Sequence, residues 1–558
     1  MLDALSFWDI LIILIYFGII LYIAKWASDS KTESGDSVDY FLAGKSQTWL
    51  VVGASLFASN IGSEIILGVS GAGARGDMPT ANFEILASLV LILLGWVFVP
   101  FYLRSGVYTM PEFLEKRYSK ACRNYLSVVS ILAYIITKIS LIIFAGALVF
   151  EVIGIPFWTG AIITVLLTGF YTVLGGLRAV IYTDMVQAFI LLAGTIAVTF
   201  FGLYQLGGWG EMMAILDNAA VGGNSPTSSE FFNLWRPISD TEYPWTGMLF
   251  GAPILGVWYW CTDQYIVQRA LSAKDIPNAR KGALFAGYLK LLPVFIFFIP
   301  GVIAFALMQE GMLEFSMDKA DQALPAMITN FLPAGLRGLA IAGLLAALMS
   351  SLSSAFNSSS TLLTIDFYQQ RNPNATEKDL VRFGQIATVV LVILSLGWIP
   401  FMETLMGGGI FRYLQNVQAY ISPPIAAVFL FGLFYPWINA RGAIVALWSG
   451  FALGMLRFVL ELMNQNGSIS VSEDSALGIF LGINFLHFAL FLFIFCAAVL
   501  MLVSRSGEAK PTEDLALLTF RKSGRGSFSM STDVILTLVL IAAVLLLWWV
   551  FSPLGIAG

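Results

Sequence analysis

The chain has 558 residues, of which 58% are hydrophobic and only 12% are charged, and its mean hydropathy is +0.82. A soluble protein of this length would be about a quarter charged, so the composition excludes a soluble globular protein. The net charge of −5 says little by itself, because the placement of the basic residues matters more, and no nucleic-acid partner is expected. Segments of about 20 apolar residues follow one another, which predicts an all-α polytopic protein of the lipid bilayer.

Fourteen segments are long and apolar enough to cross the bilayer as helices. In chain order they cover 7–26, 48–70, 83–104, 125–149, 157–175, 179–205, 246–268, 281–308, 334–366, 382–403, 408–435, 441–463, 476–504 and 531–554. One set of alternate loops, span ends included, holds 22 of the 30 lysines and arginines, whereas the other set holds only Arg75, Arg236, Lys319 and Arg337. By the positive-inside rule the first set is cytoplasmic, which predicts a multi-pass protein of the plasma (cytoplasmic) membrane with both termini outside.

The loops between the spans are short, so the sequence predicts a single transporter domain over 1–558 with no soluble domain attached. The longest loops, 206–245 and 505–530, carry Gly, Ser and Thr and are expected to be surface loops. One histidine, His487, and three scattered cysteines offer no transition-metal or redox site. We find no nucleophile–base constellation either, so neither an enzyme nor an organic cofactor is expected.

Two spans are interrupted by polar and helix-weakening residues. The second span, "TWLVVGASLFASNIGSEIILGVSGAG", carries Asn60 and Glu64 near its middle. A carboxylate in hydrocarbon costs roughly 2.5–3.5 kcal/mol on insertion scales unless it faces protein, water or an ion. The seventh span contains "GAPILGVWYWCTDQ", where Gly251, Pro253 and Gly256 weaken the helix before a polar patch.

The two interrupted spans lie five spans apart in the sequence. Such pairs mark inverted-repeat transporters, which bind their substrate near the bilayer midplane. We therefore expect 48–205 to form one repeat and 246–435 an inverted second repeat, with 7–26 and 441–554 as peripheral helices. The alternative is that the glycines serve only close helix packing. That explains any single glycine, but not two interrupted spans that both carry polar side chains.

Glu84 and Lys290 are the ionisable residues that stand most isolated among apolar neighbours, in "NFEILAS" and "GYLKLLP". They occupy the third and eighth spans, which are equivalent in the two repeats. They could form a structural ion pair, or Glu84 could snorkel from its helix end. As ligands, a balanced acid and base with amide side chains suit a neutral polyhydroxylated solute, because each can accept from or donate to adjacent hydroxyls. A carboxylate substrate would favour surplus positive charge or a helix N-terminus.

The run "GLLAALMSSLSSAFNSSS" at 343–360 places Ala347, Ser350 and Ser351 on one face of a helix. Small hydroxyl residues in membrane helices usually serve packing, so this run alone is weak evidence of a site. Na⁺ needs hard oxygen ligands, which hydroxyls and the carbonyls of an unwound helix supply. Ala58 and Ile61 in the second span are the expected source of such carbonyls.

Four motifs give the chain a resemblance to a known family: "ASNIGSE", "GGLRAVIYTDMVQ", "WYWCTDQYIVQRALSAK" and "YLQNVQAYISPPIAAVFLFGLF". The chain resembles the sodium/solute symporter family, and more narrowly its sodium–glucose cotransporter branch, from about residue 7 to about residue 505. The resemblance implies a LeuT-type five-plus-five inverted repeat within fourteen transmembrane helices, and transport by alternating access.

The resemblance also implies roles for particular residues. The sugar site would be Asn60, Glu84, Tyr259, Trp260, Lys290 and Gln415. Tyr259 would be the inner gate, and Phe83 and Phe411 would be the outer gate. The alternative to a gate or sugar-binding role is that these aromatic residues simply contact the protein core or lipid. Sodium would be bound by Ala58, Ile61, Ala347, Ser350 and Ser351.

Some members of the family bind a second sodium ion, at positions that match Asp184, Ser350, Ser353 and Ser354 here. From charge alone, Asp184 could equally be a counter-ion to Arg178 at the edge of a loop. Whether one or two sodium ions move per cycle stays open at this point.

Three positions differ from the sugar-transporter pattern. Ile65 stands where relatives have Gln or His, Gly256 where they have Asn or Thr, and Ala87 where one has Ser. Each lost hydrogen bond is worth about 0.5–1.5 kcal/mol. An inositol or a deoxy-sugar could therefore suit the site.

The sequence thus predicts a Na⁺-coupled symporter that imports a neutral hexose such as glucose or galactose. The alternatives are a Na⁺ symporter of another solute (myo-inositol, sialic acid, proline, pantothenate or iodide) and a sugar sensor or sodium-leak channel on the same scaffold. The oligomeric state is left open.

Overall fold

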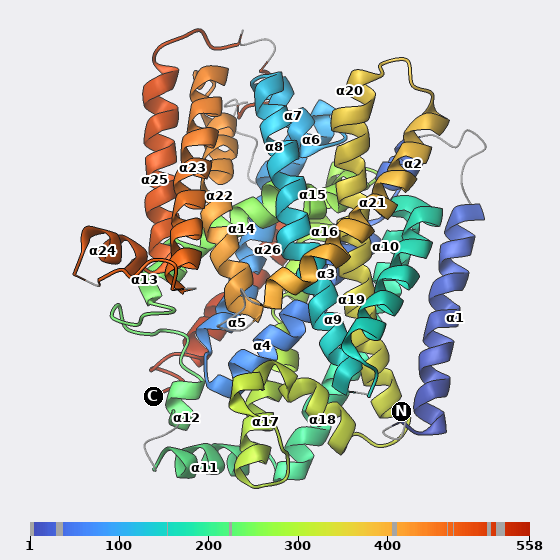
Figure 1. The fold of residues 1–558 in the computed structure, drawn as a ribbon, viewed down its shortest axis with the longest axis vertical. Coiled ribbons are helices and arrows are strands. Elements are labelled where there is room, and N and C mark those ends of the chain that lie inside the picture. The colour runs from blue at the N-terminus through green and yellow to red at the C-terminus, as the bar shows by residue number, and fades with distance from the viewer. Residues whose placement is uncertain are drawn as a thin grey trace.

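The computed structural model describes residues 5–29, 37–152, 154–221, 226–403, 410–465, 467–472, 474–510, 515–520 and 531–558. Every regular element within these residues is a helix (Figure 1). The first half contains α1 (Phe7–Asp29), α2 (Ser37–Leu42), α3 (Trp49–Asn60), α4 (Ser63–Arg75), α5 (Pro79–Leu93), α6 (Val99–Ser105), α7 (Met110–Arg117), α8 (Lys120–Ala133), α9 (Ser140–Val152), α10 (Phe157–Leu206), α11 (Trp209–Ala220), α12 (Ser228–Phe231) and α13 (Trp245–Phe250).

The second half contains α14 (Ala252–Gly256), α15 (Gln264–Leu271), α16 (Ile276–Leu289), α17 (Ile299–Gln309), α18 (Ala323–Phe331), α19 (Leu336–Thr361), α20 (Gln369–Arg371), α21 (Glu377–Glu403), α22 (Ile410–Phe434), α23 (Ala440–Gln465), α24 (Ala476–Gly482), α25 (Phe485–Ser504) and α26 (Thr532–Val550). Two short 3₁₀ helices, η1 (Ala43–Lys45) and η6 (Met317–Gln322), lie between them.

Eleven helices of the described residues are long and apolar enough to cross a membrane, and a bent pair, Trp49–Asn60 with Ser63–Arg75, makes a twelfth. The fifth and seventh predicted spans fall on the shorter apolar segment Phe157–Val173 and on the interrupted stretch from α13 to α15. A multi-pass membrane protein is therefore confirmed, and the count of fourteen spans stays a prediction. Figure 1 shows both chain ends at the same end of the molecule, as an even number of crossings requires.

Helix α19 forms the centre of the bundle, and α26 and α1 lie at its edge. In the most apolar 18-residue window of each span, the buried share is 94% for Leu336–Arg371, 22% for α1 and 17% for α26. Helix α10 makes its most extensive contacts with α19. Helix α10 consists of two helical segments, because the backbone of Gly176 (φ 59°, ψ −157°) is not helical and bends the element between the two spans predicted there.

Within the described residues, five spans contain a π-turn, a single wider turn inside an α-helix. These are η2 (Leu94–Phe98), η3 (Tyr134–Ile139), η4 (Val257–Thr262), η5 (Val294–Phe298) and η7 (Leu362–Tyr368). The turns η2 and η5 lie five predicted spans apart, as do η3 and η7, and η4 lies five spans after the break between α3 and α4. Because π-turns are rare and concentrate at functional sites, this pairing supports the predicted inverted repeat.

Two expectations about the periphery are wrong. The segment 476–504 is not one span, because Gly482 ends α24 and the Asn484 side chain caps α25 by accepting from the backbone N–H of Leu486 at 2.9 Å. The segment 206–245 is not simply a loop, since it contains α11 and α12, and Thr227 and Glu230 form a capping box at the start of α12. Most of the other long loop, 505–530, lies outside the described residues.

Candidate functional site

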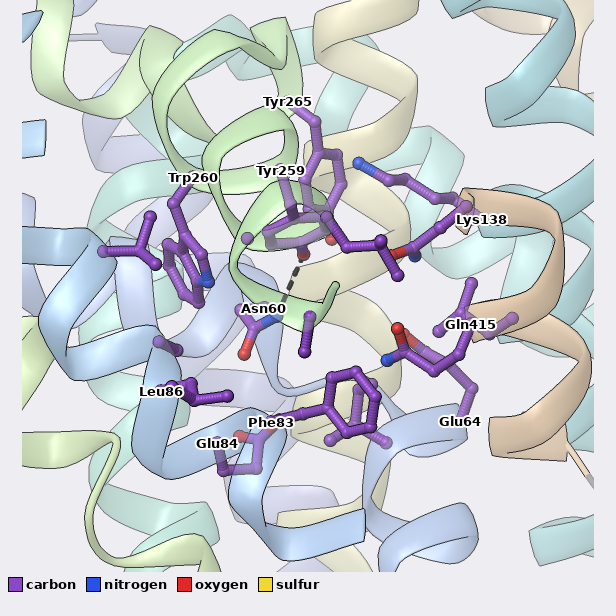
Figure 2. A pocket seen from close by; sticks show the side chains of 18 residues that line it. Asn60, Glu64, Phe83, Glu84, Leu86, Lys138, Tyr259, Trp260, Tyr265 and Gln415 are labelled. Carbon is purple, nitrogen blue, oxygen red and sulfur yellow. Dashed lines mark hydrogen bonds between the residues drawn. The ribbon is translucent and has the colours of Figure 1, made fainter. Parts of the chain in front are cut away.

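A pocket lies where the two interrupted spans face α5 and α22 (Figure 2). Asn60 comes from the end of α3, and Glu64 and Ile65 come from the start of α4. Helix α5 contributes Phe83, Glu84, Leu86, Ala87 and Val90, and α22 contributes Leu414, Gln415 and Gln418. The second interrupted span contributes Ala252, Leu255, Gly256, Tyr259, Trp260 and Tyr265, and Lys138 of η3 completes the lining. The interruptions thus bring polar side chains from both halves of the chain to one place.

A chain of polar contacts crosses this pocket. Lys290 is fully buried and donates to both the carboxylate of Glu84 and the side-chain oxygen of Asn60. The Asn60 amide then donates to the Tyr259 hydroxyl at 3.0 Å. Lys290 does not itself line the cavity, so it fixes Glu84 and Asn60 from behind. This contact is the ion pair that the sequence left as the structural alternative for Glu84 and Lys290, and Lys290 thereby holds two residues that face the cavity.

Aromatic residues lie at two sides of the pocket. The Phe83 and Phe411 rings meet edge-to-face with their centroids 5.6 Å apart, and Figure 2 shows Tyr259 and Trp260 across the pocket from Phe83. The cavity volume is about 60 Å³, which is enough space for a few ordered waters.

The three positions at which the sequence departs from the sugar-transporter pattern, Ile65, Ala87 and Gly256, all line the pocket. Ile65 and Ala87 are buried. A Cβ atom added at Gly256 would lie 3.0 Å from Val90 Cγ2, so a larger residue there would crowd the pocket wall. Each position gives the cavity an apolar patch instead of a hydrogen-bonding group. These apolar positions lie in a lining that also contains Glu64 on α4 and Glu84 on α5.

Sequence reasoning placed Glu64 at the sugar pocket, but it did not assign the polar lining residues Lys138, Tyr265 and Gln418. Gln418 is three residues after Gln415, so helical spacing alone would have placed it on the same face. Glu64 and Lys138 were among the few ionisable residues inside predicted spans, which are functional candidates by default. Tyr265 had no such signal, because 14% of the chain is aromatic.

Lys138 lies in an aromatic cage on one side of the pocket. It forms an ion pair with Asp263, whose other carboxylate oxygen accepts from Tyr134. The Lys138 ammonium also lies 3.9 Å from the Tyr265 ring centroid and 4.5 Å from that of Tyr259. Since Lys138 and Tyr134 belong to η3 and Asp263 ends η4, this cluster joins two spans at their π-turns.

The predicted sodium ligands also come together. The Ser350 hydroxyl donates to the carbonyl of Ala58 at 3.0 Å and to that of Ala347 at 3.0 Å. Ile61, Ala347 and Ser351 are buried beside them, and among the described residues the Ser351 hydroxyl has no hydrogen-bond partner. A buried hydroxyl without a partner is costly, so a ligand that accepted or supplied a contact to Ser351 Oγ would gain from it.

The Ala58 carbonyl is available because of the break in the helix. The Gly62 N–H, which would bond Ala58 in a continuous helix, bonds the Asn60 carbonyl at 3.0 Å instead. The axes of α3 and α4 then differ by 62°. A break that frees carbonyls next to hydroxyls provides the oxygen set that Na⁺ prefers.

Asp184 faces inward from α10 and is fully buried. One carboxylate oxygen accepts from Ser55 at 2.7 Å and from Ser59 at 3.2 Å, and the other has no partner among the described residues. Ser59 in turn lies 2.9 Å from the Ser354 hydroxyl, while the Ser353 hydroxyl donates to the Ser350 carbonyl at 3.0 Å. This burial between α3 and α19 argues against a counter-ion role at a loop edge. Ser55 and Ser59 were not predicted, although their spacing places them on one helix face.

Comparison with known proteins gives a consistent result. The model of the sodium:solute symporter family matches residues 40–450. Sodium/glucose cotransporter 1 of Oryctolagus cuniculus is 38% identical over 550 residues, which cover 94% of this chain and 82% of that protein. Sodium/glucose cotransporter 4 of Homo sapiens is 38% identical over 533 residues, which cover 92% of this chain and 78% of that protein.

The fold also has a solved counterpart. The structure of a Na⁺-coupled sialic acid symporter in its substrate-bound outward-open state aligns with a TM-score of 0.75, at 20% identity, and covers 90% of this chain and 99% of that chain. At this identity the likeness concerns the fold, and it confirms the all-α, LeuT-type class predicted from the sequence. Because the family model matches well over half of the residues and relatives are similar over nearly the whole length, the chain belongs to the sodium:solute symporter family.

Proposed function

We propose that this chain is a Na⁺-coupled symporter that imports a neutral hexose, such as glucose or galactose, by alternating access across the plasma membrane, with both termini outside. One observation carries the proposal: the fully buried Lys290 is held between Glu84 and Asn60 beside a broken span. A neutralised acid–base pair with amides suits hydroxyl groups rather than an ionic solute. The curated relatives described above, which are named sodium/glucose cotransporters, support the same conclusion.

In this proposal the sugar is bound by Asn60, Glu84, Tyr259, Trp260 and Gln415, to which we add Gln418 because it lines the same pocket. Lys290, which the sequence also suggested as a sugar ligand, acts here through Glu84 and Asn60. The aromatic faces of Tyr259 and Trp260 cover the C–H surface of the ring, and the amides and Glu84 accept and donate to its hydroxyls. Phe83 and Phe411 separate to admit the sugar from outside, and Tyr259 yields to release it inside. Lys290 keeps Glu84 and Asn60 oriented throughout.

Sodium is bound by the carbonyls of Ala58, Ile61 and Ala347 and by the hydroxyls of Ser350 and Ser351. The ion replaces the Ser350 hydroxyl as partner of Ala58 and gives Ser351 the partner that it lacks among the described residues. This binding fixes the end of α3, where Asn60 lies, and so prepares the sugar site. Each positive charge that moves inward gains about 2.3 kcal/mol per 100 mV.

A second sodium ion would bind at Asp184, together with Ser350, Ser353 and Ser354. The unpartnered carboxylate oxygen of Asp184 supports this site. Two ions per cycle predict two charges per sugar in a reversal-potential measurement, and Asp184→Asn should lower that ratio to one. A ratio of one in the unaltered protein would remove the second site from the proposal.

The test of function is uptake of a labelled panel, including glucose, galactose, 2-deoxyglucose, myo-inositol, proline and sialic acid, into proteoliposomes with an inward sodium or choline gradient. We expect concentrative hexose uptake in sodium only. Ser350→Ala and Ser351→Ala should reduce uptake to the choline level. Ser358→Ala is the matched control, because its hydroxyl is equally buried on α19 but bonds within its own helix.

Equal uptake in choline would refute sodium coupling. Sodium-dependent uptake of proline or sialic acid without hexose would assign another solute. Sugar binding without accumulation would indicate a sensor or a leak channel.

A further inference from the structure

Tyr265 touches both predicted sites at once. Its ring lines the central pocket, and its hydroxyl points toward the carbonyls of Ser59 on α3 and Ser351 on α19. Ser59 lies between the predicted sodium ligand Ala58 and the sugar residue Asn60 in the chain. The Ser351 carbonyl belongs to a residue whose hydroxyl is a predicted sodium ligand. This one side chain therefore spans from the sugar pocket to both walls of the sodium site.

The position of Tyr265 is fixed from three directions. Its backbone N–H lies 3.2 Å from Asp263 Oδ1 and 3.1 Å from the Tyr134 hydroxyl, where α15 begins. The Lys138 ammonium packs over its ring, 3.9 Å from the centroid. The side chain itself is only 2% exposed. Because its backbone is anchored and Lys138 covers the ring, the side chain can respond to a movement of Ser59 or Ser351 only by a small shift of the ring and not by a change of rotamer.

We propose that Tyr265 is the positioning residue that couples sodium binding to sugar binding. This inference rests on the proposed function. Sodium draws the end of α3 and the middle of α19 toward one ion, which sets the separation of the Ser59 and Ser351 carbonyls. The Tyr265 hydroxyl follows them, and its ring takes the place that the sugar pocket requires. Coupling of this kind needs an element whose position both ligands bias, and it must be reciprocal.

The test compares hexose binding to purified protein at zero and at saturating sodium. The ratio of the two dissociation constants measures coupling, and ratios of about 5–150 are typical of coupled sites. Tyr265→Phe removes the hydroxyl but keeps the ring. We expect this variant to lower the ratio toward one, with the number of hexose sites unchanged. The half-saturating sodium concentration should then lose its dependence on hexose by the same factor.

The matched control is Tyr102→Phe. Tyr102 is also buried, and its hydroxyl donates at 2.6 Å to the carbonyl of Cys261 in the second interrupted span, away from the sodium ligands. We expect the control to keep the wild-type ratio. A merely structural role for Tyr265 would change the two dissociation constants in parallel and leave their ratio intact.

A double-variant comparison checks the route of the effect. In a Ser350→Ala background, which lacks the sodium response, Tyr265→Phe should produce no further change in hexose affinity. If the Phe variant is not recovered as folded, monodisperse protein, Tyr265→His, whose shorter side chain cannot reach both carbonyls, takes its place under the same criteria. A wild-type ratio in the Tyr265 variant, or an equal loss in Tyr102→Phe, would overturn the inference while leaving the proposed function intact. Absence of any sodium effect on hexose binding by the unaltered protein would overturn both.

Discussion

The two interrupted spans differ in what happens to the carbonyls that each interruption frees. Between α3 and α4 the chain bends by 62°, and the Ala58 carbonyl is left to the hydroxyl of Ser350. At η4 the freed groups are taken by other side chains: Thr262 donates to the Trp258 carbonyl at 2.8 Å and Tyr102 donates to that of Cys261 at 2.6 Å. The first interruption therefore leaves a carbonyl oxygen that an ion could bind. At the second interruption, side chains already bond the carbonyls, and aromatic rings face the pocket.

This difference fits the proposed division of roles, in which the first interruption serves sodium and the second serves the sugar. An ion needs carbonyls that can turn toward it, and a sugar needs rigid surfaces and fixed hydrogen-bond partners. Asp263 supplies that rigidity by capping α15 and pairing with Lys138. We expect the second interruption to be stable without sodium and the first to depend on it.

The largest expected effect comes from breaking the rigid interruption. Lys138→Met leaves the Asp263 carboxylate buried without its ion partner, and removing one member of a buried pair costs about 3–5 kcal/mol. We expect a corresponding loss of stability in denaturant or thermal unfolding of the purified protein. The double variant Lys138→Met with Asp263→Leu should recover much of it. A loss well below 1 kcal/mol in the single variant would show that the pair does not hold this interruption.

A smaller effect is expected on the stabilisation of the protein by sodium, which should depend on the first interruption and not on the second. Sodium at about 100 times its dissociation constant stabilises a binding protein by about 2.7 kcal/mol. We expect sodium to raise the unfolding temperature of the unaltered protein, but not that of Ser351→Ala. Tyr102→Phe, which frees a carbonyl only at the second interruption, should keep the sodium response. Loss of the response in that variant would contradict the division of roles between the two.

The smallest effect concerns Ile65 of α4. Ile65→Gln adds a donor and an acceptor to the lining of the pocket, and a single hydrogen bond is worth about 0.5–1.5 kcal/mol. We expect a several-fold change in the ranking of hexoses and deoxy-hexoses as competitors for uptake. Leu166→Gln on the exposed face of α10 is the control for a polar substitution away from the pocket. An unaltered ranking would mean that position 65 does not contact the substrate.

Much of this site could be predicted from the sequence, because charges in a membrane need partners. Glu84 and Lys290 stood isolated among apolar residues, and the structure pairs them. The pair of Lys138 and Asp263 escaped prediction because both residues lie next to interruptions, where periodicity no longer tells which way a side chain points. Tyr265 escaped because an aromatic residue in an apolar span carries no signal of its own. Hydropathy also missed the break before α25, since one Asn484 cap hardly changes the average over a segment.

The π-turns have a consequence for movement during transport. Each π-turn contains one more residue than an α-helical turn. A span that contains a π-turn therefore has one extra residue within the membrane. Such a bulge can migrate along its helix by exchanging one hydrogen bond at a time. The two flanking halves then rotate relative to each other without exposing unpaired backbone groups to lipid. Lys138 and Tyr259 sit on such turns, so they can be redirected while the spans that carry them remain intact.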